Sequence, residues 1–206
     1  MIDEKDYLAD PCGSASLPLW KTLQIEVPDN IMVIRDDEYV EGTINGSDEP
    51  YFKMIHNLEN VSVPVLSDDY VLSTATDDEF AAHIQECYES ECLSVEEIGI
   101  YKKRQVYDTN LWIAIREQKT RKIVASGIGE LDKSIGEGTL EWIQVSTAHR
   151  HKGLGKYVVA ELLSRLRGRA EFVTVSGKLN SPSNPYELYI ACGFSNPVIW
   201  HIVHKD

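Results

Sequence analysis

Basic side chains are scarce in the first half of this 206-residue sequence. Residues 1–99 hold 4 Lys or Arg against 23 Asp or Glu, whereas residues 100–206 hold 16 against 10. The whole chain carries a formal net charge of −13. Nonspecific nucleic-acid binding requires a basic face that neutralises phosphates, so this charge argues against a nucleic-acid partner.

Long apolar runs and cysteine pairs are also missing. No apolar run approaches the roughly 20 residues that a membrane-spanning helix requires. The acidic start, Met1–Asp6, is not followed by the apolar segment of a secretory signal. We therefore expect a cytoplasmic protein with no membrane partner. The four cysteines form no Cys-x-x-Cys pair, and Cys87 and Cys92 have only His83 as a further local ligand, so we expect reduced thiols and no metal site.

The chain divides by composition into an accessory region, residues 1–68, and a main domain, residues 69–206. Turn-prone Pro, Gly and Ser are frequent in residues 1–18, which we expect to be mobile. The rest of the accessory region is predicted to contain a strand at Ile31–Arg35 and, after a proline, a short helix at Tyr51–Leu58.

The main domain shows the element order β-α-α-β-β-β-α-β-α-β. Two capping boxes, Thr76-x-x-Glu79 and Ser94-x-x-Glu97, predict the starts of two helices. From Leu154 onward, apolar residues at i+4 spacing predict a longer amphipathic helix. The remaining strands and the last helix are predicted at Tyr70–Thr74, Asn110–Arg116, Ile123–Leu131, Glu137–Val145, Phe172–Ser176, Tyr186–Cys192 (helix) and Val198–Val203.

A basic, glycine-containing loop follows the strand that ends at Val145. Its sequence from Arg150 to Lys156 is RHKGLGK, and it leads directly into the amphipathic helix. Glycines let a ligand approach the backbone, and the first amides of a helix attract anions. The spacing excludes a Walker loop and a Rossmann fingerprint. On these residues alone, a tight turn that needs glycine is an equal alternative to phosphate binding.

This loop and the element order together resemble the GNAT superfamily of acyl-CoA-dependent N-acetyltransferases. The family signature Arg/Gln-x-x-Gly-x-Gly/Ala is matched by Arg150-x-x-Gly153-x-Gly155, and a second motif by Leu188-Tyr189-x-x-x-Gly193-Phe194. The resemblance covers roughly residues 69–206. It implies a mixed α/β (α+β) fold, with a mostly antiparallel central sheet flanked by helices and a splay between the fourth and fifth core strands.

The resemblance also implies acetyl-CoA as the acyl donor, with its pantetheine arm in the splay and its pyrophosphate on the loop amides. No metal is implied. Many members use an asparagine before the tyrosine helix; here that position is Pro182, and Asn184 is a substitute that could equally be a helix N-cap. The donor-binding residues implied are Ile143, Gln144, Val145, Arg150, His151, Lys152, Gly153, Leu154, Gly155, Lys156 and Asn184.

Acyl transfer to an amine needs a base and an acid. The resemblance makes Tyr189 the acid that protonates the leaving thiolate, although a tyrosine can also simply pack in a core. Glu141 is the candidate base, because strand alternation would place it on one face with Ile143 and Val145. It could instead merely face solvent, and the substitutes for it are Glu130 and Glu137.

The expected activity is transfer of an acetyl group from acetyl-CoA to a primary amine, of a small molecule or a protein, by direct attack in a ternary complex. A catalytically silent acyl-CoA-binding module that regulates or scaffolds is the main alternative, and a structural protein without a ligand is a third. The acidic residues 1–99 would attract cationic amines or a basic partner, or serve only solubility. A homodimer stays open.

The main domain ends with one strand, Val198–Val203, where the family usually has a sixth and a seventh strand. Exposed sheet edges tend to be covered. We therefore expect the strand at Ile31–Arg35 to pack on this edge and to substitute for a missing strand.

Overall fold

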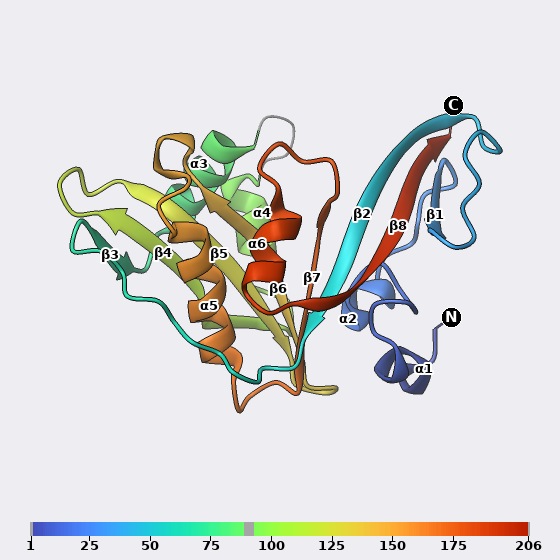
Figure 1. Cartoon of the computed structure of the whole chain (residues 1–206), viewed down its shortest axis with the longest axis horizontal. Helices are drawn as coiled ribbons and strands as arrows, with labels where there is room; N and C mark the ends of the chain where they lie inside the picture. The colour runs from blue at the N-terminus through green and yellow to red at the C-terminus, as the bar shows by residue number, and fades with distance from the viewer. Residues whose placement is uncertain (1, 89–92, 206) are drawn as a thin grey trace. The chain divides into compact units, whose positions relative to one another are not determined.

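The computed structural model describes residues 2–88 and 93–205, and the chain forms two compact units. One unit consists of residues 57–173, and the other combines residues 1–56 with residues 174–206. Figure 1 labels the helices and strands of both units. The sequence-based boundary at residue 68 stays a prediction.

In the unit of residues 57–173, four strands hydrogen-bond in the order β6–β5–β4–β3. Their pairing is antiparallel throughout. The strands are β3 (Tyr70–Ser73), β4 (Tyr107–Glu117), β5 (Ile123–Asp132) and β6 (Glu137–Val145), and each overlaps its predicted range.

Helices cover both faces of these four strands. Helix α5 (Leu154–Leu166) lies on one face, where a Cβ added to Gly127 would stand 2.5 Å from Val158. On the other face, Ile128 joins a core cluster with side chains of α3 (Asp77–Cys87) and α4 (Val95–Tyr101). Neighbouring strand residues point to opposite faces, so this alternation separates the two layers. The expected fold class, mostly antiparallel strands flanked by helices, is confirmed; the splay stays a prediction.

Both predicted capping boxes are present. Thr76 Oγ1 accepts a hydrogen bond from the Glu79 amide at 3.3 Å, and Glu79 Oε2 accepts one from the Thr76 amide at 2.9 Å. Ser94 and Glu97 form the same pair of bonds at the start of α4. Each box satisfies amides that a helix leaves without intrahelical partners, which is why these local patterns could be identified from sequence.

The other unit contains strands in the order β1–β8–β2–β7. Strand β8 pairs antiparallel with β1 from Ile31↔His204 to Arg35↔Trp200, so the hypothesis that the N-terminal strand covers this edge is confirmed. The elements are α1 (Glu4–Ala9), α2 (Leu19–Thr22), β1 (Ile31–Arg35), β2 (Gly46–His56), β7 (Phe172–Lys178), α6 (Pro185–Ala191) and β8 (Ser195–Lys205).

The helix predicted at Tyr51–Leu58 is wrong, because most of these residues belong to β2, which pairs with β8. Phe52, Lys53 and Met54 are all buried, so the strand lacks the apolar–polar alternation that marks a half-exposed strand. Short apolar runs of this kind cannot be assigned from periodicity, and here the tertiary pairing with β8 decides.

The expectation that residues 1–18 are mobile is also wrong for the residues that the structure describes. Tyr7 and Cys12 are buried, and the ammonium of Lys53 on β2 binds this segment. Lys53 Nζ lies within hydrogen-bonding distance of Tyr7 Oη (3.0 Å) and of the carbonyl oxygens of Pro11 (2.7 Å), Ala15 (3.0 Å) and Leu17 (2.7 Å). The Lys53 ammonium thus holds these turn-prone residues through their backbone carbonyls. Contacts to backbone carbonyls leave no pattern in the side-chain sequence.

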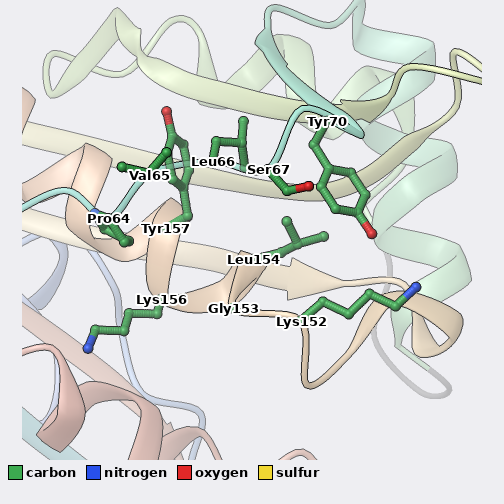
Figure 2. Close-up of a pocket in the computed structure, with 10 residues that line it drawn as sticks. All are labelled: Pro64, Val65, Leu66, Ser67, Tyr70, Lys152, Gly153, Leu154, Lys156 and Tyr157. Carbon is green, nitrogen blue, oxygen red and sulfur yellow. The ribbon is translucent and has the colours of Figure 1, made fainter.

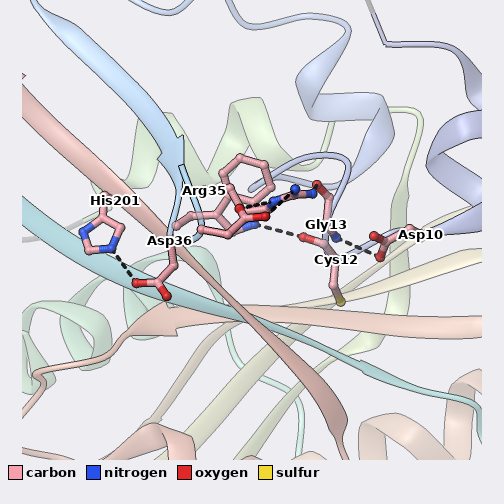
Figure 3. A network of polar contacts seen from close by, with 8 residues as sticks. Asp10, Cys12, Gly13, Arg35, Asp36 and His201 are labelled. Carbon is pink, nitrogen blue, oxygen red and sulfur yellow. Dashed lines mark hydrogen bonds and ion pairs between the residues drawn. The ribbon is translucent and has the colours of Figure 1, made fainter. Parts of the chain in front are cut away.

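Two more side chains hold the same segment, and Figure 3 shows their neighbourhood. Arg35 donates a hydrogen bond to the carbonyl of Gly13 at 3.2 Å, and Trp200 Nε1 donates one to the carbonyl of Cys12 at 2.9 Å. Arg35 also forms an ion pair with Asp37. The segment is therefore bound by side chains from three strands: β1, β2 and β8.

In residues 2–88 and 93–205, none of the helices is long and apolar enough to cross a membrane. Within the same ranges no group of three or more His, Cys, Asp or Glu is arranged to hold a metal ion. Cys92, one of the two cysteines considered as metal ligands, lies outside the described residues.

Candidate active site

The basic loop connects β6 to the N-terminus of α5. After Val145 the chain makes a short 3-10 turn at Thr147–His149, and it reaches the helix through two residues with left-handed backbone, His151 (φ 61°) and Gly153 (φ 80°). Gly153 occupies the N-cap position of α5 and tolerates this conformation because it has no Cβ. The predicted loop therefore ends where the sequence placed it, at a helix start.

The first amides of α5 are donors without partners inside the helix. The first intrahelical bond runs from the amide of Tyr157 to the carbonyl of Gly153 at 3.0 Å, so the amides of residues 154–156 precede it. No side chain caps this end. The aligned peptide dipoles add positive potential there, and Lys152 and Lys156 add full charges. This arrangement can bind a phosphate or a pyrophosphate.

A small pocket of about 110 Å³ lies beside this helix start. Figure 2 shows Lys152 and Lys156 pointing away from each other on either side of Gly153. The pocket is lined by Pro64, Val65, Leu66, Ser67, Tyr70, Lys152, Gly153, Leu154, Lys156 and Tyr157. Sequence reasoning placed a domain boundary after residue 68 and missed this contact, because a non-regular segment carries no pattern that predicts its neighbours.

Strand β6 contains a β-bulge in its second half. Ser126 pairs with Gln144 and Ile128 pairs with Glu141, so two residues of β6, Trp142 and Ile143, lie opposite one residue of β5. Trp142 adopts a left-handed backbone (φ 50°), as the first residue of some bulges does. An extra residue shifts the alternation of side chains by one position.

The bulge corrects the argument that put Glu141 on one face with Ile143 and Val145. Directly opposed residues project from the same face, and Glu141 lies opposite Ile128, which packs against α3 and α4. Glu141 therefore shares the α3–α4 face with Gln144. Its role as a base stays a prediction, and so do those of Glu130 and Glu137, which are both buried.

Aromatic side chains surround the bulge. Trp142 Nε1 donates a hydrogen bond to Tyr101 Oη at 3.2 Å, and the rings of Tyr88 and Trp142 meet edge to face at 5.4 Å. Tyr88 Oη donates to the carbonyl of Ile143 at 3.4 Å. Tyr88, directly after α3, and Tyr101 on α4 thus hold the bulge through side chains that sequence reasoning did not single out.

Gln144 is buried next to the bulge, with 5% of its surface exposed. Its Nε2 donates a hydrogen bond to Ser126 Oγ at 2.5 Å. Its Oε1 has no hydrogen-bond partner among the described residues. A buried acceptor without a partner costs free energy, so a ligand with an N–H or O–H donor would be favoured beside it.

The second motif lies in the other unit. Tyr189 on α6 is buried, and its ring packs against Phe52 at 6.0 Å and Phe194 at 5.5 Å. Gly193 ends the helix with φ 93°, which explains the glycine of the motif. Asn184 is the N-cap residue of α6, but its side chain makes no capping bond. The roles of Tyr189 and Asn184 in catalysis and donor binding stay predictions.

Solved structures define the class of fold. The chain is similar to a GCN5-related N-acetyltransferase from Sphaerobacter thermophilus, at 16% identity and a TM-score of 0.63 over 77% of this chain and 52% of the other. At identities this low the similarity establishes the fold, which is that of the GNAT acetyltransferases. No family model and no curated protein matches the sequence.

Two further structures share this fold. A putative acetyltransferase of the GNAT family from Novosphingobium aromaticivorans matches at 14% identity and a TM-score of 0.54, over 88% of this chain and 70% of the other. An acetyltransferase of the GNAT family from Colwellia psychrerythraea matches at 13% identity and 0.58, over 84% and 64%. The chain spans about half the length of the Sphaerobacter protein.

Proposed function

We propose that this chain is an N-acetyltransferase that moves an acetyl group from acetyl-CoA to a primary amine, of a small molecule or a protein. The observation that carries the proposal is the loop from Arg150 to Lys156, which places basic residues around a helix start whose first amides have no intrahelical partner, in a GNAT fold. The amine attacks the thioester directly while both substrates are bound.

The residues present fit an acyl-CoA donor. The amides of residues 154–156, with Arg150, Lys152 and Lys156, match the charge of its pyrophosphate and 3′-phosphate. The partnerless Oε1 of Gln144 is a buried acceptor, and the pantetheine arm carries amide N–H donors. These features support donor binding by this chain's own residues at the end of β6.

The chemistry assigns two proton-transfer roles. The amine nitrogen forms a bond to the carbonyl carbon, the carbon–sulfur bond breaks, and the sulfur leaves as a thiol. Glu141 would accept the proton that the amine loses, directly or through water. Tyr189 would supply the proton that the sulfur gains. No metal takes part in this scheme.

The first test is calorimetric titration of the protein with acetyl-CoA and CoA, followed by thiol release over a panel of amines. Binding together with thiol release supports the proposal, and no binding of either compound refutes it. Binding without release for every amine would indicate a silent acyl-CoA-binding module.

A substitution then tests the acid. Tyr189→Phe should lower turnover about 100-fold or more, with the affinity for CoA changed less than about twofold, because general acid catalysis commonly contributes that much. Tyr186→Phe on the same helix is the matched control, since Tyr186 also packs against Phe52. Equal turnover in the two variants would remove Tyr189 from the mechanism.

A further inference from the structure

A buried histidine joins α3 to the two strands that lead into the basic loop. His83 is 3% exposed, its Nδ1 lies 2.8 Å from Ser126 Oγ on β5, and its Nε2 lies 3.1 Å from Ser146 Oγ. Ser146 is the residue directly after β6 and is itself buried. One ring thus fixes the point where the chain leaves the sheet for the loop.

The ring acts as a neutral hydrogen-bonding bridge. Burial is the main cause that lowers the pKa of His83 to about 4, so near neutral pH one ring nitrogen donates and the other accepts. With Gln144 Nε2 donating to Ser126 Oγ, the hydroxyl proton of Ser126 is directed to Nδ1. His83 then carries its proton on Nε2 and donates to Ser146 Oγ. The four side chains form one continuous chain of hydrogen bonds in a single direction.

This chain ties together the two features that would bind an acyl donor. At one end it orients Gln144, whose Oε1 is buried and without a partner. At the other end it holds Ser146, whose amide also donates to the carbonyl of Val124 at 2.9 Å. The sulfur of Cys87 lies 3.6 Å from Nε2 and is a weak additional partner. Burial raises the pKa of this thiol to about 11, so it is not a competing anion.

We propose that His83 is a positioning residue for donor binding, which sets the side chain of Gln144 and the start of the loop at Ser146 before the acyl-CoA arrives. The inference rests on the proposed function. A purely structural histidine would stabilise the fold but would leave the affinity for CoA unchanged once stability is matched.

The test uses the full chain and CoA as the probe. His83→Leu keeps the volume and removes the hydrogen bonds of the ring, including those to Ser126 and Ser146. His83→Gln restores a polar side chain, and Ile84→Val on the same helix is a control for loss of core packing. We expect the Kd for CoA to rise about tenfold in His83→Leu, as for the loss of a buried hydrogen-bond network. It should rise less than about threefold in His83→Gln and Ile84→Val.

A second measurement does not depend on CoA. Hydrogen exchange of the amides of residues 146–156 should be accelerated in His83→Leu and not in Ile84→Val, at temperatures chosen to give equal stability. A double-mutant cycle of His83→Leu and Ser146→Ala should show coupling in the unfolding free energy, because either change breaks the hydrogen bond between His83 Nε2 and Ser146 Oγ.

The outcomes separate this inference from the proposed function. If the wild type binds CoA and His83→Leu binds it as tightly as Ile84→Val does, the inference is overturned while the function stands. If the wild type does not bind CoA, the proposed function fails. In that case accelerated exchange of residues 146–156 still supports positioning of the loop by His83, and unchanged exchange overturns it.

Discussion

Replacement of Lys53 by methionine tests whether buried charge, rather than apolar packing, orders the N-terminal segment. The side chain is 1% exposed, and its ammonium is bound by three backbone carbonyls and a tyrosine hydroxyl. Lys53→Met keeps most of the aliphatic stem but leaves the carbonyls of Pro11 and Ala15 without this donor. The hydroxyl can rotate to another partner, and the Leu17 carbonyl keeps a hydrogen bond from Thr22 Oγ1 at 3.3 Å.

The expected loss of stability follows from the carbonyls of Pro11 and Ala15. Each buried polar group left unsatisfied costs about 1–3 kcal/mol, and removing the buried ammonium returns part of that cost. We therefore expect the free energy of unfolding to fall by about 2–4 kcal/mol. Urea unfolding monitored by circular dichroism measures it, with Lys5→Met as a control because Lys5 is exposed on the same segment.

A local measurement complements the global one. Hydrogen exchange of residues 4–17 should be accelerated in Lys53→Met and unchanged in Lys5→Met. Ordinary surface substitutions change the unfolding free energy by up to about 0.5 kcal/mol. If Lys53→Met differs from the control by no more than this and its hydrogen exchange is unchanged, Lys53 does not order the N-terminal segment. The segment would then be held by the burial of Tyr7 and Cys12 instead.

Two further predictions concern packing and pH. Gly127→Ala would bring a methyl group within 2.5 Å of an α5 side chain, so the unfolding free energy should fall by about 1–3 kcal/mol. The control Gly99→Ala, whose new methyl group meets nothing within 4 Å, should not destabilise the protein. Thermal unfolding measures both variants, and equal unfolding free energies would contradict the packing of α5 on Gly127. Burial disfavours the charged form of His201, but hydrogen bonds to Asp36 and Asp48 outweigh it and raise its pKa above 6.5. Protonated His201 therefore stabilises the fold fully below pH 6.5, and this contribution is lost as pH rises through the pKa of the folded state. The unfolding free energies of wild type and His201→Gln should differ most at acidic pH and converge at alkaline pH. A difference that stays constant with pH would contradict this.

Sequence patterns were sufficient wherever a few neighbouring residues decide the structure. The capping boxes at Thr76 and Ser94, the helix from Leu154 and the strand Glu137–Val145 were predicted correctly. Helix starts depend on side chains within one turn, and amphipathic periods on residues within a few turns. The basic loop also follows from its local sequence, because glycines and a helix start lie within seven residues.

Tertiary structure decided what depends on residues far apart in the chain. Strand β2 forms because β8 pairs with it, and residues 2–18 are held in place because Lys53 reaches carbonyl oxygens in this segment. The bulge at Trp142 moves Glu141 to the α3–α4 face, and His83 meets Ser146 across 63 positions. Such contacts are set by packing and by the need to satisfy buried polar groups, and neither leaves a periodic trace in sequence. The sequence by itself therefore determined helices α3 to α6, most strands and the basic loop before α5, and only the folded chain decided which side chains contact the start of that loop.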